Sequence, residues 1–133
     1  MRRRMIALLI VLPLTAAAST APISDNTEAE VYSTVGKASY YSSRLHGRAT
    51  ASGELYDQTA LTAAHPNLPF GTIVCVTNTR TGQSVAVRIN DRGPFTGGRI
   101  IDLSRRAARE IGMINAGSAR VHVESCPQMA EES

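Results

Sequence analysis

The sequence contains no tryptophan, only two cysteines and two phenylalanines, and none of the compact motifs that hold a metal or a nucleotide. Its histidines and cysteines are not spaced as metal ligands, no glycine-rich nucleotide loop occurs, and no Gly-x-Ser-x-Gly segment marks a serine hydrolase. We therefore expect no cofactor and no metal site. At 133 residues the chain is also too short for a separate cofactor domain, which favours a single domain.

A hydrophobic run long enough to span a membrane is also missing. Residues 5–18 (MIALLIVLPLTAAA) are apolar, but they fall short of about 20 residues and are interrupted by Pro13. Three arginines precede the run and three alanines close it, which predicts a secretory signal peptide over residues 1–18, with an uncleaved signal anchor as the alternative. No cysteine follows the run directly. We expect a periplasmic or secreted product that is not a lipoprotein and has no stable membrane anchor.

A surplus of positive charge is absent once the predicted signal peptide is set aside, because its three arginines account for the whole net charge of +3. A nucleic-acid partner would require a cationic face, so we expect none. The predicted domain, residues 36–126, is mildly cationic, with 11 basic against 6 acidic residues, since the other five acidic residues lie in the two tails. This surplus is either solvated surface charge or a groove for a polyanionic polymer such as cell-wall glycan with peptide stems.

The two cysteines, Cys75 and Cys126, belong to a chain that is expected to leave the cytoplasm, where disulfides form. A bridge between them would close a loop of roughly 50 residues and add about 4 kcal/mol in the chain-entropy model. We therefore predict a disulfide, with two buried thiols as the alternative, because sequence spacing does not show how close the two residues lie.

Short alternating segments predict a mostly β domain. A polar, aperiodic lead-in over residues 19–35 is expected to be flexible, and a polar tail covers residues 127–133. The predicted strands are residues 37–41, 72–77, 84–90 and 120–124, with a hairpin turn at 78–83. One helix is expected over residues 103–111, capped by Asp102 or Ser104 and ended by Gly112, whereas residues 59–65 fit a short helix or a strand. These elements favour a small closed or half-closed barrel.

Three loop segments bracketed by glycine or proline carry the candidate chemistry: residues 46–54 (HGRATASGE), 62–66 (TAAHP) and 90–95 (NDRGPF). Their candidate catalytic acids or bases are Glu54, His65 and Asp91 respectively. Taken singly, Asp91 is more typical of a turn residue, and the other two are typical of loop surface. Together they form a candidate acid/base set.

The ordered trio of motifs resembles the rare lipoprotein A family of bacterial envelope proteins. The similarity runs over about 90 residues from Gly36, through GKASYYSSRLHGRATASGELYD, TALTAAHPNLPFGT and VAVRINDRGPFTGGRIIDLSRRAA. It implies a six-stranded double-psi β-barrel with one or two short helices. It also implies a lytic transglycosylase that cleaves the β-1,4 bond between N-acetylmuramic acid and N-acetylglucosamine in peptidoglycan and leaves a 1,6-anhydro end.

The resemblance places the family's essential polar residues at Glu54, His65 and Asp91. We expect Asp91 to protonate the glycosidic oxygen and then to accept a proton from the sugar's own C6 hydroxyl, so that no second carboxylate is required as nucleophile. Glu54 is expected to position the sugar or to stabilise positive charge at the anomeric carbon. His65 is expected to orient Asp91 or to bind substrate.

Further candidates concern binding of the glycan. Arg92 is either a structural donor to nearby carbonyls or a contact to a lactyl or peptide carboxylate. Tyr41, Tyr56 and Phe95 are candidate stacking surfaces for sugars, with core packing as the alternative. Two motifs depart from the family pattern, since Tyr40-Tyr41-Ser42 replaces Trp-Tyr-Gly and Ser52 replaces Asn before Gly53. These changes affect details of glycan binding.

The expected partner is peptidoglycan glycan, bound by a monomer. Two other functions remain open from the sequence. One is a non-catalytic wall-binding module resembling the expansins. The other is an inverting glycan hydrolase of similar fold, which would need two carboxyl groups roughly 6.5–9.5 Å apart with room for water.

Overall fold

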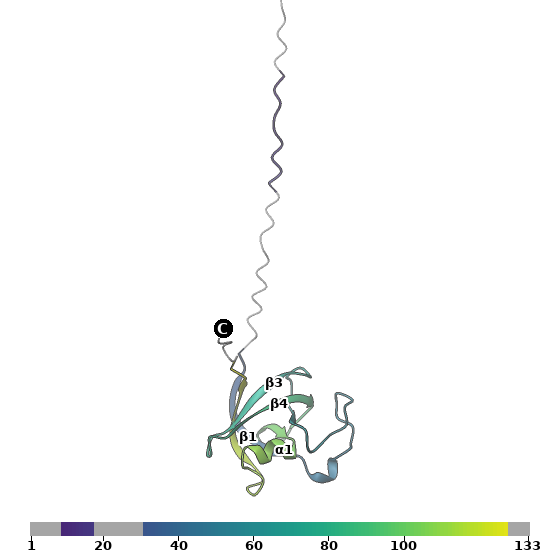
Figure 1. Ribbon diagram of the computed structural model, residues 1–133, viewed down its shortest axis with the longest axis vertical. Coiled ribbons are helices and arrows are strands. Elements are labelled where there is room, and N and C mark those ends of the chain that lie inside the picture. The colour runs from purple at the N-terminus through teal and green to yellow at the C-terminus, as the bar shows by residue number, and fades with distance from the viewer. Residues whose placement is uncertain (1–8, 18–30, 128–133) are drawn as a thin grey trace, which may run out of the picture.

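The computed structural model describes residues 9–17 and 31–127, and within them six strands close into a barrel (Figure 1). Around the barrel the strand order is β1-β5-β2-β4-β3-β6, and β6 pairs back onto β1. The elements are β1 (Ser33–Tyr40), the 3₁₀ helix η1 (Ser43–Leu45), β2 (Thr62–Ala64), β3 (Ile73–Asn78), β4 (Ser84–Asp91), β5 (Arg99–Leu103), α1 (Arg105–Glu110) and β6 (Ala119–Ser125).

The pairing in the barrel is mixed. Strands β1 and β5 are parallel, as are β2 and β4, whereas the remaining neighbours are antiparallel. The mostly β, six-stranded double-psi barrel with one short α-helix is thereby confirmed. Closure leaves no strand with an unpaired edge, which is how a small all-β domain avoids edge-to-edge association.

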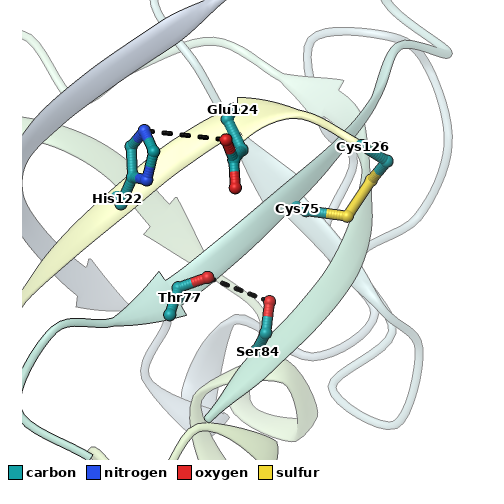
Figure 2. The surroundings of a disulfide bond; sticks show 6 residues. All are labelled: Cys75, Thr77, Ser84, His122, Glu124 and Cys126. Atoms are coloured by element: carbon teal, nitrogen blue, oxygen red, sulfur yellow. Dashed lines mark hydrogen bonds and ion pairs between the residues drawn. A yellow bond between two sulfur atoms is a disulfide. The ribbon is translucent and has the colours of Figure 1, made fainter. Parts of the chain in front are cut away.

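Alternation along the strands separates the core from the outer surface. The fully buried side chains on the inward face of the strands are mainly branched aliphatics: Val74, Val76, Val87, Ile89, Ile101, Leu103, Val121 and Val123. Residues between them point outward, and Figure 2 shows Thr77 of β3 beside Ser84 of β4, and His122 beside Glu124 along β6. The two-residue alternation in the sequence therefore determines which side chains face the barrel core and which face outward.

A disulfide joins Cys75 in β3 to Cys126 just beyond β6 (Figure 2). The two Cα atoms are 4.9 Å apart because β3 and β6 are antiparallel neighbours in the barrel. The covalent link ties the end of the last strand to the middle of the third.

Two strands lie in segments that the sequence pattern leaves ambiguous or assigns to no strand. The ambiguous segment 59–65 contains a strand, β2, whose three residues are all buried between β4 and β5. Strand β5 is not among the predicted strands, and its last residue, Leu103, falls in the predicted helix. The Leu103 side chain instead completes the barrel core with Ile101. Strand β1 begins at Ser33, three residues before the expected start of the domain, because residues 33–35 pair with β6.

Helix α1 is capped by Ser104, and the role considered for Asp102 is wrong. The Ser104 hydroxyl accepts a hydrogen bond from the Ala107 amide at 3.2 Å, and Gly112 follows the helix with φ of +71°. Asp102 still lies in β5, where its carboxylate accepts hydrogen bonds from Arg99 at 2.8 Å and from Ser39. Its strand position holds it away from the first amides of the helix.

Half of the predicted signal peptide, most of the predicted lead-in over residues 19–35 and all but one residue of the predicted C-terminal tail lie outside the described residues. Residues 9–17 have no regular secondary structure, and their side chains are exposed. Within residues 9–17 and 31–127, no helix is long and apolar enough to cross a membrane.

Candidate active site

A pocket of about 340 Å³ lies where the long connection between β1 and β2 meets the end of β4. That connection carries η1 and projects from one side of the barrel (Figure 1). The pocket is lined by Tyr41, Leu45, Arg48, Ala49, Thr50, Tyr56 and Asp91. The barrel thus supplies a rigid carboxylate, and the connection supplies most of the surrounding wall.

Asp91 is the last residue of β4, and the hydrogen bonds to its carboxylate come from three separate directions. Oδ1 accepts from the backbone amides of Ala51 and Arg92, each at 2.9 Å, and Oδ2 accepts from the Tyr41 hydroxyl. Since both donors to Oδ1 are backbone N–H groups, that oxygen can act only as an acceptor. Oδ2, beside a hydroxyl that can donate or accept, is therefore the oxygen available to carry a proton.

The turn over residues 49–55 presents its backbone to Asp91. Thr50 binds the Glu54 carbonyl through both its amide and its hydroxyl, at 2.8 Å in each case, and the Ser52 amide donates to the Asn90 carbonyl at 3.3 Å. Gly53 takes φ of +91°, which a residue with a side chain rarely adopts. The TASGE sequence therefore folds into a tight turn that rests on the end of β4.

Glu54 lies beside this site and outside the pocket lining. Its two carboxylate oxygens accept from Arg88 Nη1 at 2.7 and 3.0 Å, and Asn90 Nδ2 donates to one of them at 2.9 Å. These hydrogen bonds, first that of Arg88 and then that of Asn90, hold the pKa of Glu54 below its usual value. The side chain remains 46% exposed, so solvent screens this ion pair.

His65 does not reach the pocket. Only 3% of the residue is exposed, its Nδ1 accepts from the amides of Asn67 and Leu68, and its Nε2 lies 2.9 Å from the Tyr32 hydroxyl. Because Nδ1 accepts two hydrogen bonds, the ring proton is on Nε2, which donates to Tyr32. Burial, followed by the charge of Arg92, lowers the pKa of His65. The link to Asp91 is through the backbone, where the His65 amide donates to the Asp91 carbonyl at 3.1 Å.

Arg92 makes the structural contacts that were one of its two expected roles. Its Nη1 donates to the carbonyls of Leu68 at 2.7 Å and His65 at 3.3 Å, and its guanidinium lies 4.0 Å above the Phe70 ring. The side chain is thereby directed to the loop after β2 and away from the pocket lining.

The aromatic candidates separate into two groups. Tyr41 and Tyr56 line the pocket with ring centroids 4.5 Å apart, and the Tyr56 hydroxyl accepts from the Arg105 amide. Burial raises the pKa of both phenols, and for Tyr41 the hydrogen bond to Asp91 raises it further. Phe95 is 76% exposed and lies outside the pocket lining.

Several site residues were not singled out from the sequence. Arg48 lines the pocket, Arg88 and Asn90 hold Glu54, and Tyr32 holds the His65 ring. Arg48 stands in the HGRATASGE segment, so its presence in a candidate loop was the available signal. Arg88 occupies an outward-facing position on a predicted strand, and nothing in the local pattern indicates its partner Glu54, 34 residues away. Within residues 9–17 and 31–127, no group of three metal-binding side chains is present.

Comparison with known proteins adds evidence of relationship. Residues 33–123 match the family model described as lytic transglycolase. Over 89 residues the chain is 63% identical to the probable endolytic peptidoglycan transglycosylase RlpA of Synechocystis sp., covering 67% of this chain and 28% of that protein. Over 93 residues it is 54% identical to the endolytic peptidoglycan transglycosylase RlpA of Neisseria meningitidis serogroup A, covering 70% and 39%. The chain spans less than two fifths of the length of these two relatives.

Solved structures show the same barrel at lower sequence similarity. The Streptomyces papain inhibitor aligns with a TM-score of 0.55 and 21% identity, covering 70% of this chain and 93% of that one. The apo expansin of Clavibacter michiganensis aligns with a TM-score of 0.57 and 24% identity, covering 74% and 52%. These two likenesses concern the fold alone. The family match extends over residues 33–123, which are nearly the whole barrel, and so this chain belongs to the lytic transglycolase family of double-psi β-barrel proteins.

Proposed function

We propose that this chain is an endolytic peptidoglycan lytic transglycosylase. It cleaves the β-1,4 bond between N-acetylmuramic acid and N-acetylglucosamine and leaves a 1,6-anhydro end. The observation that carries the proposal is the Asp91 carboxylate, which is fixed at the end of a barrel strand in the wall of a pocket. Membership of the family and the curated names of the two relatives support the peptidoglycan substrate.

The reaction needs one group that first gives and then takes a proton. Asp91, protonated on Oδ2, donates to the glycosidic oxygen as the bond to the anomeric carbon breaks. The C6 hydroxyl of the muramic acid then attacks that carbon, and its proton passes to Asp91. No water is consumed, and the attacking group is already held within the same sugar.

Tyr41 supports the second half of this cycle. Burial and the neighbouring carboxylate raise its pKa, so the phenol stays protonated throughout the neutral range. It can therefore donate to Oδ2 when Asp91 is ionised and accept from Oδ2 when Asp91 carries the proton. The Ala51 and Arg92 amides fix the other oxygen, so the carboxyl group keeps its orientation in both states.

Glu54 and His65 are best assigned as positioning residues. Glu54 is bound by Arg88 and Asn90, and its backbone closes the turn whose Ala51 amide reaches Asp91. His65 holds the loop after β2 and contacts Asp91 only through the backbone. Their removal is expected to disturb the geometry at Asp91 without removing a group that touches the sugar.

The products of digestion test the reaction itself. Purified sacculi are incubated with the protein, and the soluble fragments are identified by mass spectrometry. Anhydro ends are the expected result. Reducing ends would replace the proposal with a glycan hydrolase, and the absence of soluble fragments would favour a non-catalytic wall-binding module.

A matched pair of variants tests Asp91. Asp91→Asn is expected to lower the rate of anhydro-product formation by at least about 100-fold, the usual contribution of a general acid, while the circular dichroism spectrum stays unchanged. Asp57→Asn serves as the control, because that exposed carboxylate bonds only to Thr59 within its own turn. Equal rates for the wild type and Asp91→Asn would contradict the assignment.

The proposed setting is the bacterial cell wall, where the enzyme would act in wall remodelling or cell separation. The relatives' names place their substrate outside the cytoplasm, and the predicted signal peptide of this chain agrees with that location. Peptidoglycan glycan strands are the proposed partner, bound by a periplasmic or secreted monomer. Fractionation of cells that produce the full chain, with detection of the processed form, tests the location.

A further inference from the structure

Arg48 is the only cation among the residues that line the pocket. Its backbone is fixed, because its amide donates to the Leu45 carbonyl at 3.0 Å and its carbonyl accepts from the Tyr56 amide at 2.7 Å. Within residues 9–17 and 31–127, its guanidinium makes no hydrogen bond or ion pair. Arg48, an exposed residue of the pocket lining, therefore carries five N–H donors without a partner from those residues.

Three other arginines near the site are already engaged. Arg88 binds Glu54, Arg92 binds two backbone carbonyls and covers Phe70, and Arg99 binds Asp102. Arg92 is directed to the loop after β2 and lies outside the pocket lining, so it is not placed to bind a carboxylate in this pocket. Arg48 can make such a contact without breaking any hydrogen bond or ion pair of its guanidinium within the part of the chain that the structure describes.

The charges of the pocket are divided between its walls. Asp91 lies at the end of β4, and Arg48 lies on the connection between β1 and β2. An anionic substituent is attracted to Arg48 and repelled from an ionised Asp91, whereas an uncharged sugar linkage can approach Asp91 freely. One bound orientation of an acidic glycan is therefore favoured over its reverse.

We propose that Arg48 binds a carboxylate of the glycan and so determines both its orientation and the choice of substrate. This inference rests on the proposed function and extends it. Two sources of the carboxylate fit a guanidinium: the lactyl group of muramic acid in peptide-free strands, and a carboxylate of the stem peptide in intact strands. The tests below distinguish them.

The first experiment measures kcat and KM on four glycans: peptide-free strands with the lactyl carboxylate free or converted to its methylamide, and peptide-bearing strands with the peptide carboxylates free or amidated. Amidation of the recognised carboxylate is expected to lower kcat/KM of the wild type by about 10- to 100-fold, the range for a hydrogen bond to a charged group. The pair of glycans for which amidation lowers kcat/KM identifies which carboxylate Arg48 binds. A wild type indifferent to both amidations would overturn the inference.

Arg48→Gln keeps polarity and removes the charge. Its kcat/KM on the glycan that carries the recognised carboxylate is expected to fall by the same factor as amidation causes in the wild type, and amidation of that glycan is expected to cause no further fall. Arg48→Lys is expected to recover part of this kcat/KM. Arg80→Gln is the control, because Arg80 is exposed in the β3–β4 turn and lies outside the pocket lining. If Arg48→Gln remains as sensitive to amidation as the wild type, the carboxylate is bound elsewhere and the inference is wrong.

A binding measurement separates this inference from the proposed function. Calorimetry with Asp91→Asn and with the double variant Asp91→Asn/Arg48→Gln uses the same four glycans, and thermal unfolding verifies that both variants are folded. A preference for the carboxylate that disappears in the double variant supports Arg48 even if the wild type cleaves no glycan. Cleavage of glycan by the wild type, with equal binding of all four glycans by Asp91→Asn, would retain the proposed function and reject the role of Arg48.

Discussion

Asp91 and Arg92 are neighbours in the sequence, and their side chains extend in different directions from the end of β4. Asp91 faces the pocket, while Arg92 crosses to the loop after β2 and binds its carbonyls. His65 lies in that loop and binds the two amides that follow it. The loop after β2 is thus held by an arginine and a neutral histidine, and we expect its stability to be sensitive to acid.

At the residue scale, we predict that His65 makes folding pH-dependent. Its pKa is lowered from 6.5 in the folded state, so between that value and the lowered one the unfolded chain binds more protons. Stability is therefore expected to fall as the pH decreases through 6.5 toward the lowered folded pKa. The free energy of unfolding in urea at pH 7.5, 6.5 and 5.5 measures this loss.

His65→Gln is expected to be less stable than the wild type at pH 7.5 and to lose less stability between pH 7.5 and 5.5. His122→Gln, on the outer surface of β6, should retain the pH dependence of the wild type (Figure 2). An identical pH dependence in the wild type and in His65→Gln would show that another group is responsible.

At the scale of elements, β2 lies between β4 and β5, each of which carries an aspartate near its end. Ala64 pairs with Asp91 of β4 on one side and with Asp102 of β5 on the other. The segment that follows β5 turns into α1 at Ser104, whose hydroxyl donates to the Ala60 carbonyl at 2.6 Å. One serine therefore caps the helix and also joins it to the chain that enters β2.

We predict that Ser104→Ala lowers the free energy of unfolding by about 1–3 kcal/mol. The change removes an N-cap and leaves a partly buried Ala60 carbonyl without this donor. Thermal and urea unfolding measure the effect. Ser43→Ala at an exposed serine of η1 should change stability by less than about 0.5 kcal/mol, and a loss for Ser104→Ala no larger than for Ser43→Ala would contradict the capping role.

At the scale of the whole molecule, closure of the barrel depends on long-range pairing. Strand β6, the last in the chain, lies between β1, the first, and β3. The Cys75–Cys126 bridge fastens β6 to β3, and residues 33–38 fasten it to β1. A domain of this size has a small core, so a covalent link between distant segments contributes substantially.

We predict that Cys75→Ala/Cys126→Ala lowers the free energy of unfolding by about 4 kcal/mol, because the bridge closes a loop with a sequence separation of 51 residues. Urea unfolding of the wild type, oxidised or treated with a thiol reductant, and of the variant measures the loss. Activity at low temperature should persist, since neither cysteine lines the pocket. Equal stability of oxidised wild type and variant would contradict this prediction.

Features that depend on neighbours along the chain can be predicted from the sequence alone. Alternation predicted β3, β4 and β6, Ser104 was one of two candidate caps, and the three motifs located Asp91 at a strand end. Tertiary structure decided which side chains meet: Glu54 binds Arg88, His65 binds Tyr32, and Arg48 takes the place in the pocket that had been considered for Arg92. The physical reason is that strand period and helix capping are local, whereas the partner of a long charged side chain depends on barrel closure, which brings together residues more than 30 positions apart.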